Sequence, residues 1–374
     1  MWWQRLDTPC AIVHRALVER NAGAMRRRAR ELGVALRPHV KTHKTVEGAR
    51  IQHGGAIGPV TVSTLAEARH LADAGFDDIT WAVPPAPQRL GEAMALIASG
   101  VRLGLILDRP EPLDRIGVGA GRAGVEVEVW LEVDCGGGRS GVDPRDPAVV
   151  ELGARMADSP RLDFRGLLTH AGQAYHRAGR EALAAAAAAE RDAVVDLARR
   201  LRAAGTPVPG VSVGSTPTAV AAEDLTGVTE ARPGNYVFFD AFQAAIGACD
   251  LGDVAFSVLA TVIAGPRERG RVVVDAGALA LSRDPGPTHV DPRCGFGVVC
   301  TPAGEPVPGL RLTSLSQEHG VVEAGDPAVL QGLEVGSRVR ILPNHSCLAA
   351  ACHDRYHVVA DDEVVEVWRP CRGW

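Results

Sequence analysis

The sequence lacks an excess of charge of one sign. Its 374 residues carry a formal net charge of −5, and acidic and basic residues are interspersed without a basic stripe. Proteins that bind nucleic acid or an anionic membrane surface through charge carry clusters of lysine and arginine. We therefore expect neither kind of partner, and expect a small-molecule ligand instead.

Long hydrophobic runs are also absent. No uninterrupted apolar stretch reaches the roughly 20 residues that a membrane-spanning helix needs. The first residues, MWWQRLDTPC, contain no basic segment followed by an apolar run. The eight cysteines lack the spacing of a disulfide-stapled mini-domain. We expect a cytoplasmic protein, without membrane association, whose cysteines are reduced thiols.

The first two thirds of the chain alternate between helix and strand patterns. Helical patterns over 16–32, 64–74, 87–99 and 180–204 each end at a glycine, which is typical of a helix C-terminus, and a strand pattern follows each glycine. The strand candidates are 36–41, 60–63, 79–83, 103–107, 125–133, 164–169, 211–214 and 228–232. Eight parallel strands with helical connections predict a TIM-like (β/α)8 barrel of the α/β class, with its active site at the carboxyl ends of the strands.

From about Cys249 helical periodicity disappears, and short β-rich runs bounded by glycine and proline take over. These runs are 256–263, 271–276, 295–299, 310–315, 338–342, 355–359 and 364–367, with a turn expected at Gly265-Pro266-Arg267. We predict a barrel over residues 8–248 and a smaller all-β domain over 249–374, against which residues 1–7 pack.

Lys41 ends the first predicted strand, within the stretch LRPHVKTHK at 36–44. A charge at the end of a buried strand is costly, so a lysine in that place usually serves chemistry. Burial and neighbouring cations such as Arg37 and His39 depress the pKa of a lysine and allow it to form a Schiff base. The alternative is a lysine on the barrel rim that extends into solvent.

Small-residue turns follow the seventh and eighth predicted strands, with the sequences VGSTPT at 213–218 and RPGNY at 232–236. Backbone N–H groups and the hydroxyls of Ser215, Thr216 and Tyr236 can bind an anion there, and in barrels these two loops commonly bind phosphate. Plain turns are the alternative. A lysine at one strand end and a phosphate site at two others suggest a cofactor with both an aldehyde and a phosphate, such as pyridoxal phosphate.

The chain resembles the alanine-racemase-like (fold-type III) pyridoxal-phosphate enzymes, specifically the D-serine dehydratase and D-threonine aldolase group. The resemblance covers essentially the whole chain, and its motifs occur in the family's order. They are RPHVKTHK at 37–44, TVSTLAEA at 61–68, VDCGGGRSG at 133–141, THAGQAY at 169–175, VGSTPT at 213–218, PGNYVFFD at 233–240 and PNHSC at 343–347.

This resemblance implies roles for individual residues. Lys41 would form the Schiff base with the cofactor and then remove the α-proton of the substrate. Arg139 would lie against the cofactor ring. Tyr175 would lie near the cofactor, and Tyr175 and His170 would be catalytic residues together with Lys41. A surface salt bridge is the alternative for Arg139 and a structural role is the alternative for His170. The remaining cofactor-binding residues would be Ser215, Thr216, Gly234, Asn235 and Tyr236.

His345 and Cys347 form the candidate metal site. On a strand, residues two apart point to the same side, so both side chains can contact one ion. Imidazole and thiolate suit Zn²⁺, and two protein ligands leave positions open for substrate and water. The H-x-C pattern alone is weak, and a chance pairing is the alternative. The resemblance supports the site.

Together these features predict a dehydratase that converts a D-3-hydroxy amino acid, such as D-serine, to a 2-oxo acid and ammonia. The first alternative is retro-aldol cleavage, for which similar aldolases offer a carboxylate at the position of Cys347. The second is a non-catalytic pyridoxal-phosphate carrier, although such carriers lack a β domain. The preferred substrate is left open among D-serine, D-threonine and D-3-hydroxyaspartate. A homodimer is expected by analogy with dimeric relatives.

Overall fold

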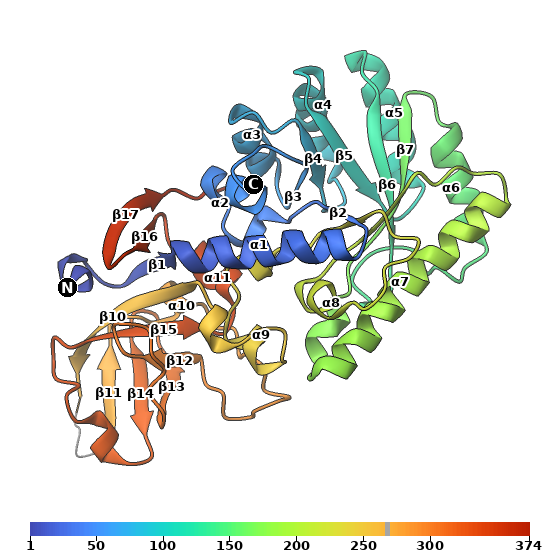
Figure 1. Ribbon diagram of the computed structural model, residues 1–374. Helices are drawn as coiled ribbons and strands as arrows, with labels where there is room; N and C mark the ends of the chain where they lie inside the picture. Colours follow the sequence, from blue (N-terminus) through green and yellow to red (C-terminus); the bar gives the residue numbers. More distant parts are fainter. Residues whose placement is uncertain (266–269) are drawn as a thin grey trace. The chain divides into compact units, whose positions relative to one another are not determined.

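The computed structural model describes residues 1–265 and 270–374, which divide into two compact units (Figure 1). The barrel unit comprises Gly23–Gly234 and Cys371–Trp374, and the β unit comprises Met1–Ala22 and Asn235–Pro370. The predicted turn at Pro266-Arg267 lies outside the described residues. Within them, no helix is both long enough and apolar enough to cross a membrane.

The barrel unit contains a sheet of eight parallel strands, and each predicted strand has a counterpart in it. The order of neighbouring strands is β2-β9-β8-β7-β6-β5-β4-β3. An isolated parallel bridge between His39 and Thr61 joins the segment after β2 to β3, so the two ends of this order meet. This arrangement confirms the predicted (β/α)8 fold. The strands are β2 (Ala35–Leu36), β3 (Val60–Val62), β4 (Asp78–Trp81), β5 (Arg102–Leu107), β6 (Val127–Val133), β7 (Leu162–Thr169), β8 (Gly210–Val213) and β9 (Glu230–Ala231).

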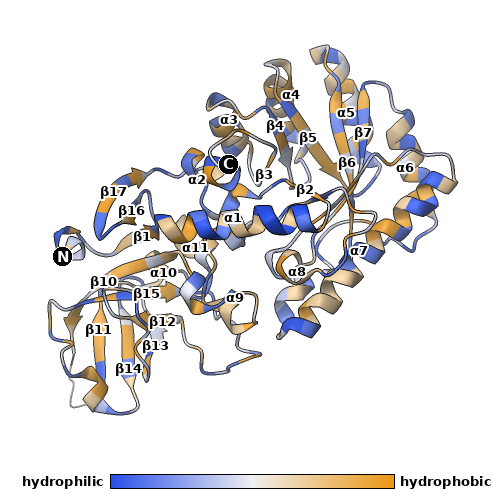
Figure 2. Cartoon of the chain, in the orientation of Figure 1, coloured by the Kyte–Doolittle hydropathy of each residue, from blue (hydrophilic) through white to orange (hydrophobic). Residues whose placement is uncertain are grey.

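Helix α1 (Arg15–Glu31) precedes β2, and further helices connect the strands. These are α2 (Val46–Gln52), α3 (Leu65–Asp73), α4 (Leu90–Ala98), α5 (Glu111–Ala123), α6 (Ala148–Asp158), α7 (Arg180–Ala203) and α8 (Thr216–Ala221). The glycines predicted to end four of them, Gly33, Gly75, Gly100 and Gly205, have φ angles of 69°, 96°, 101° and 90°. This left-handed backbone costs glycine little, which is why the helices stop there. Figure 2 shows mostly hydrophobic residues along β5 and alternating residue types along α7, as expected for a buried strand and a half-buried helix.

The described residues of the β unit form nine strands, of which the sequence predicted all but β1 and β14. The strands are β1 (Cys10–His14), β10 (Phe256–Ala264), β11 (Arg271–Val274), β12 (Gly297–Cys300), β13 (Leu310–Leu315), β14 (Gly320–Ala324), β15 (Arg338–Pro343), β16 (Tyr356–Ala360) and β17 (Glu363–Trp368). Their order is β13-β14-β11-β10-β1-β16-β17, and β15 pairs with β10 and β12. The unit is mostly β rather than all β, because it also contains α9 (Ala241–Ala245), α10 (Ala278–Leu281) and α11 (Ser346–Ala351).

The compact units differ from the predicted boundaries of 8–248 and 249–374. Strand β1 pairs with β10 and with β16, so the start of the chain belongs to the β unit. Trp2 lies in a hydrophobic cluster with Cys10 and Leu259 of the same unit. At the other end, the N–H of Cys371 donates to the carbonyl oxygen of Lys44 at 2.7 Å, within the barrel unit. Hydrophobic periodicity does not reveal such partners, because they are distant in sequence.

Candidate active site

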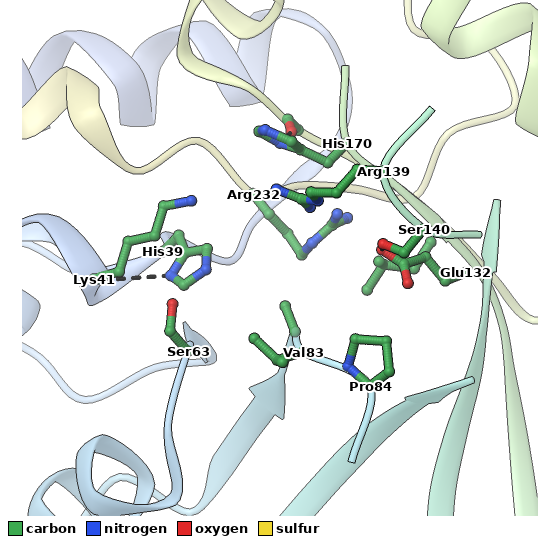
Figure 3. A pocket seen from close by; sticks show the side chains of 13 residues that line it. His39, Lys41, Ser63, Val83, Pro84, Glu132, Arg139, Ser140, His170 and Arg232 are labelled. Atoms are coloured by element: carbon green, nitrogen blue, oxygen red, sulfur yellow. Dashed lines mark hydrogen bonds between the residues drawn. The ribbon is translucent and has the colours of Figure 1, made fainter. Parts of the chain in front are cut away.

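A cavity of about 350 Å³ lies at the carboxyl ends of the barrel strands (Figure 3). Lys41, Arg139 and His170, which were predicted from three separate motifs, all line it. The carboxyl ends of parallel barrel strands meet at one face, so polar side chains that follow different strands gather there. The remaining lining residues are His39, Ser63, Ala82, Val83, Pro84, Glu132, Ser140, Leu168, Gly214 and Arg232.

Lys41 lies in a short 3-10 helix, Val40–Thr42, and not at the end of a strand as predicted. Strand β2 ends at Leu36, although the N–H groups of Arg37 and His39 still donate to carbonyl oxygens at the end of β9 and just after it. His39 then caps the turn, since its Nδ1 accepts the backbone N–H of Lys41 at 3.4 Å. The Lys41 side chain extends past this ring, with its amine pointing into the cavity (Figure 3).

Two histidines of the cavity are neutral. Burial and the nearby Lys41 and Arg139 cations lower the pKa of His170 to about 3. Its Nδ1 hydrogen-bonds the carbonyl oxygen of Gly214, so Nδ1 carries the hydrogen and Nε2 carries a lone pair. Burial, with Lys41 and Arg232, also holds the pKa of His39 well below its usual value. Near neutral pH both histidines therefore offer hydrogen bonds without adding positive charge.

Arg232 lies directly after β9, and sequence reasoning missed it. The side chain is buried, and its guanidinium donates to the carbonyl oxygens of Thr169 and Val213 and to the hydroxyl of Ser212. Burial lowers its pKa to about 10, although Glu230 and Glu190 oppose the shift, so it remains a cation at neutral pH. The signal that identified Lys41, a charge at the end of an apolar strand, also marks this residue.

Glu132 is the acidic residue of the cavity lining and was also missed. It lies on β6 with 4% of its surface exposed, and its Oε1 accepts the Ser140 hydroxyl at 2.9 Å. Among the described residues, no donor reaches its buried Oε2. Burial raises the pKa of this carboxyl, while Ser140 and Arg139 oppose the rise. The cavity therefore offers an unsatisfied acceptor as well as two arginines.

Glu190 of α7 links two turns that follow neighbouring strands, because its side chain accepts hydrogen bonds from both. Its Oε1 accepts the N–H of Ala171 after β7 and the N–H of Gly214 after β8, both at 3.0 Å. Its Oε2 accepts the hydroxyl of Thr218 in α8 at 2.6 Å. Sequence reasoning missed this role, because a glutamate in a long surface-type helix is ordinarily solvated.

The predicted phosphate-binding residues are not among the residues that line the cavity. Ser215 caps α8, since its Oγ accepts the N–H of Thr218 at 3.3 Å and also hydrogen-bonds the Thr218 hydroxyl at 2.8 Å. Thr216 begins this helix and is buried. Tyr175 lies in a 3-10 helix, Gly172–His176, and is also absent from the lining. Gly234 ends the barrel segment of the chain, and Asn235 and Tyr236 belong to the β unit.

In the β unit, His345 and Cys347 lie at a turn between a strand and a helix. Strand β15 ends at Pro343, His345 is the N-cap of α11 and Cys347 lies in its first turn, so the strand geometry predicted for this pair is wrong. The two side chains are nevertheless in contact, and a hydrogen bond joins them. Burial disfavours protonation of His345, but Cys347 and the carboxylates of Asp284 and Asp240 raise its pKa to about 11.

The backbone between His345 and Cys347 is held by a buried carboxylate. Oδ2 of Asp240 accepts the N–H of Ser346 at 3.0 Å and the side-chain amide of Asn235 at 2.7 Å. The same amide lies 2.9 Å from the Ser346 hydroxyl and 3.7 Å from Sγ of Cys347. Asn235, predicted to bind the cofactor, thus contacts Ser346 and Cys347, within the predicted metal site.

Comparison with known proteins identifies the family. Residues 13–241 match the model described as alanine racemase, N-terminal domain, and residues 255–359 match the putative serine dehydratase domain. The D-threo-3-hydroxyaspartate dehydratase of Delftia sp. (strain HT23) is 44% identical over 99% of this chain and 98% of its own length. The D-serine dehydratase of Dictyostelium discoideum is 35% identical over 99% and 98%.

The chain belongs to the alanine-racemase-like family of D-serine dehydratases and D-threonine aldolases. It is therefore an enzyme of the lyase class. Within this family, a solved mutant of the D-threo-3-hydroxyaspartate dehydratase, described as in the metal-free form, has a TM-score of 0.95 and 42% identity to this chain, over 100% of both chains.

Proposed function

We propose that the chain is a pyridoxal-phosphate- and zinc-dependent dehydratase that converts a D-3-hydroxy amino acid, such as D-serine, to a 2-oxo acid and ammonia. The observation that carries the proposal is the position of Lys41 in one cavity with Arg139, His170 and Arg232. A lysine amine and fixed cations at the strand ends of a barrel suit a cofactor that carries both an aldehyde and a phosphate. The names of the dehydratase relatives support the reaction.

The cavity residues fit pyridoxal phosphate. The orphaned Oε2 of Glu132 is a buried acceptor for which the described residues supply no donor, and a ligand can satisfy it. At Gly214 an added Cβ would lie 2.9 Å from the backbone nitrogen of Arg232, so glycine allows the two strand-end turns to pack closely. Lys41 would hold the aldehyde carbon, and Arg139 would lie against the ring.

The turns that begin at Ser215 and Gly234 remain our candidates for the phosphate. Because the Ser215 hydroxyl caps α8, we propose that backbone N–H groups of this turn and of Thr216, rather than that hydroxyl, bind the anion. The contributions of Tyr175, Asn235 and Tyr236 stay predictions.

Pyridoxal phosphate, when bound, supplies an electron sink that makes the α-proton of an amino acid acidic. The Lys41 amine then serves as the base that takes this proton at Nζ. His170 is neutral, with a lone pair on Nε2, so it accepts hydrogen bonds there, and because its pKa is lowered to about 3 it is too weak a base to compete with Lys41 for the α-proton. The guanidinium groups of Arg139 and Arg232 orient anionic groups.

The pair of His345 and Cys347 fits Zn²⁺, because imidazole and thiolate are both ligands that zinc prefers. A zinc ion there would supply Lewis acidity for the departure of a β-hydroxyl group. Thiolate at position 347, in place of the carboxylate expected in aldolases, favours dehydration over retro-aldol cleavage. The β unit that carries this pair argues against a non-catalytic carrier. The homodimer and the cytoplasmic location stay predictions.

Product analysis with D-threonine tests the reaction type. Zinc-loaded and pyridoxal-phosphate-loaded enzyme should release 2-oxobutyrate and ammonia. Glycine and acetaldehyde would instead mean retro-aldol cleavage. That result would refute the argument that a thiolate at position 347 favours dehydration. Turnover should disappear in Lys41→Ala, and chelation should abolish turnover until zinc is added back.

The lysine content of the chain allows a sharp test of the cofactor site. Lys41 and Lys44 are its only lysines. Borohydride reduction of the loaded enzyme should attach the cofactor to the peptide that contains Lys41, and mass spectrometry should place it on that residue. Lys44→Arg is the matched control and should label normally, because the Lys44 amine pairs with Glu67 at 2.8 Å. Label on Lys44 or on the N-terminal amine would contradict the assignment.

A further inference from the structure

The candidate metal site offers few protein ligands. In residues 1–265 and 270–374, no group of three or more histidine, cysteine, aspartate or glutamate side chains is placed to hold an ion. When only His345 and Cys347 bind the metal, the orientation of each ligand has a large effect on affinity. The groups that orient these two side chains therefore decide how well the site works.

Asp284 faces the imidazole of His345 from a segment that follows α10. Its Oδ2 lies 3.1 Å from Nδ1 of His345, while its Oδ1 accepts the N–H of Gly286 at 2.9 Å. One carboxylate oxygen thus fixes the local turn, and the other is directed at the histidine. The Asp284 side chain is 19% exposed, so solvent weakens this contact less than it would weaken a surface ion pair.

Asn344 holds the segment that contains Asp284 beside His345. Its side-chain amide donates to the carbonyl oxygen of Asp284 at 3.1 Å and to that of Gly295 at 2.8 Å. A Cβ at Gly286 would lie 2.7 Å from Cγ of Asn344, so the glycine gives the amide room. Because Asn344 directly precedes His345, one amide sets the distance between the carboxylate and the imidazole.

We propose that Asp284 is a positioning residue of the metal site: it accepts the Nδ1–H of His345 and so presents Nε2 of the imidazole to the ion. An imidazole that binds a metal ion is neutral and carries a single N–H, and a hydrogen fixed on Nδ1 leaves the lone pair on Nε2 for the ion. The carboxylate also makes Nε2 a more basic ligand. This inference rests on the proposed metal site and adds a residue that the H-x-C motif does not contain.

Asp284 can be changed without releasing the turn that carries the ligands. The backbone of Ser346, between His345 and Cys347, is held separately by Asp240 at 3.0 Å. Asparagine at 284 keeps an oxygen for the Gly286 N–H, so Asp284→Asn removes the charge and leaves the local turn in place. Asp291→Asn is the matched control, because Asp291 makes the same kind of turn with the N–H of Arg293, at 2.9 Å, and is exposed.

The test measures the zinc dissociation constant of the pyridoxal-phosphate-loaded enzyme by competition with a chromophoric chelator. We expect Asp284→Asn to weaken zinc binding about 10-fold and Asp284→Ala up to about 100-fold. Asp291→Asn should bind zinc as the wild type does. Thermal unfolding of the metal-free variants checks that each one is folded, and Asp284→Glu should recover part of the affinity.

Two results would overturn the inference. If Asp284→Asn bound zinc as tightly as the wild type, Asp284 would serve the local turn alone. If His345→Ala bound zinc as tightly as the wild type, or if the wild type bound no zinc, the proposed metal site itself would fail, and the role of Asp284 with it. Zinc affinity that depends on His345 but not on Asp284 separates the first failure from the second.

Discussion

Replacing Glu190 tests how the active-site turns are held in the barrel unit. This glutamate is 2% exposed and accepts three hydrogen bonds, from Ala171, Gly214 and Thr218. Two of these donors are backbone groups at the ends of neighbouring strands, and Gly214 in turn accepts the hydrogen bond from His170. One carboxylate thus determines the spacing of the turns that carry part of the cavity.

The size of the effect follows from these three bonds. Glu190→Ala leaves two buried backbone N–H groups without an acceptor and removes one partner of the Thr218 hydroxyl, at roughly 1–2 kcal/mol each, so we expect a loss of about 4 kcal/mol in the free energy of unfolding. Glu190→Gln keeps an oxygen for both backbone donors, and its amide can donate to the Thr218 hydroxyl. We expect it to cost about 1 kcal/mol or less.

Charge also favours the glutamine variant. Burial raises the pKa of Glu190, although the Thr218 and Gly214 hydrogen bonds oppose the rise. Because the folded-state pKa is raised, this carboxyl favours folding most below its unfolded pKa, and that contribution is lost as the pH rises through the folded pKa. At neutral pH the ionised carboxylate therefore bears a burial penalty that a neutral amide avoids.

Urea unfolding of the cofactor-free enzyme, followed by tryptophan fluorescence, measures these differences. Glu181→Ala is the matched control, because Glu181 is exposed in the same helix, α7. Glu190→Ala should also bind pyridoxal phosphate more weakly than this control. If Glu190→Ala unfolded at the urea concentration of Glu181→Ala, or if Glu190→Gln were as unstable as Glu190→Ala, the argument would be refuted.

Two further predictions concern the barrel unit. Gly48→Ala should destabilise it by about 2 kcal/mol, because the new Cβ would lie 2.7 Å from Cε1 of the buried His43 ring. Gly117→Ala, in the middle of α5 with nothing within 4 Å of the new Cβ, should stabilise it by up to about 1 kcal/mol, and urea unfolding of both variants checks the contrast. Acidification should also destabilise the unit. Burial lowers the pKa of His43 to about 4, whereas in the unfolded chain the ring takes up a proton near pH 6.5, so stability is lost as the pH falls below that value. His43 alone should cost about 2 kcal/mol between pH 7 and pH 5, and an unchanged urea midpoint at pH 5 would contradict its neutral burial.

Local signals in the sequence were sufficient for the barrel. Alternating helix and strand patterns, with a glycine at the end of a helix, gave all eight strands of the sheet, because burial on both faces of a parallel sheet leaves continuous apolar runs. The same local logic failed at 36–41, where the strand ends at Leu36 and Lys41 falls on a 3-10 helix. It also failed at His345 and Cys347, which begin a helix instead of continuing a strand.

The sequence by itself determined the barrel and brought Lys41, Arg139 and His170 to one end of it, because strand order and direction alone bring those positions together. Tertiary structure decided the rest. Arg232 and Glu132 line the cavity, and Glu190 accepts a hydrogen bond from the turn at Gly214. Asp284 contacts His345, which lies 61 residues away in the sequence. Each of these contacts joins segments far apart in the chain, and no local periodicity records such a pairing.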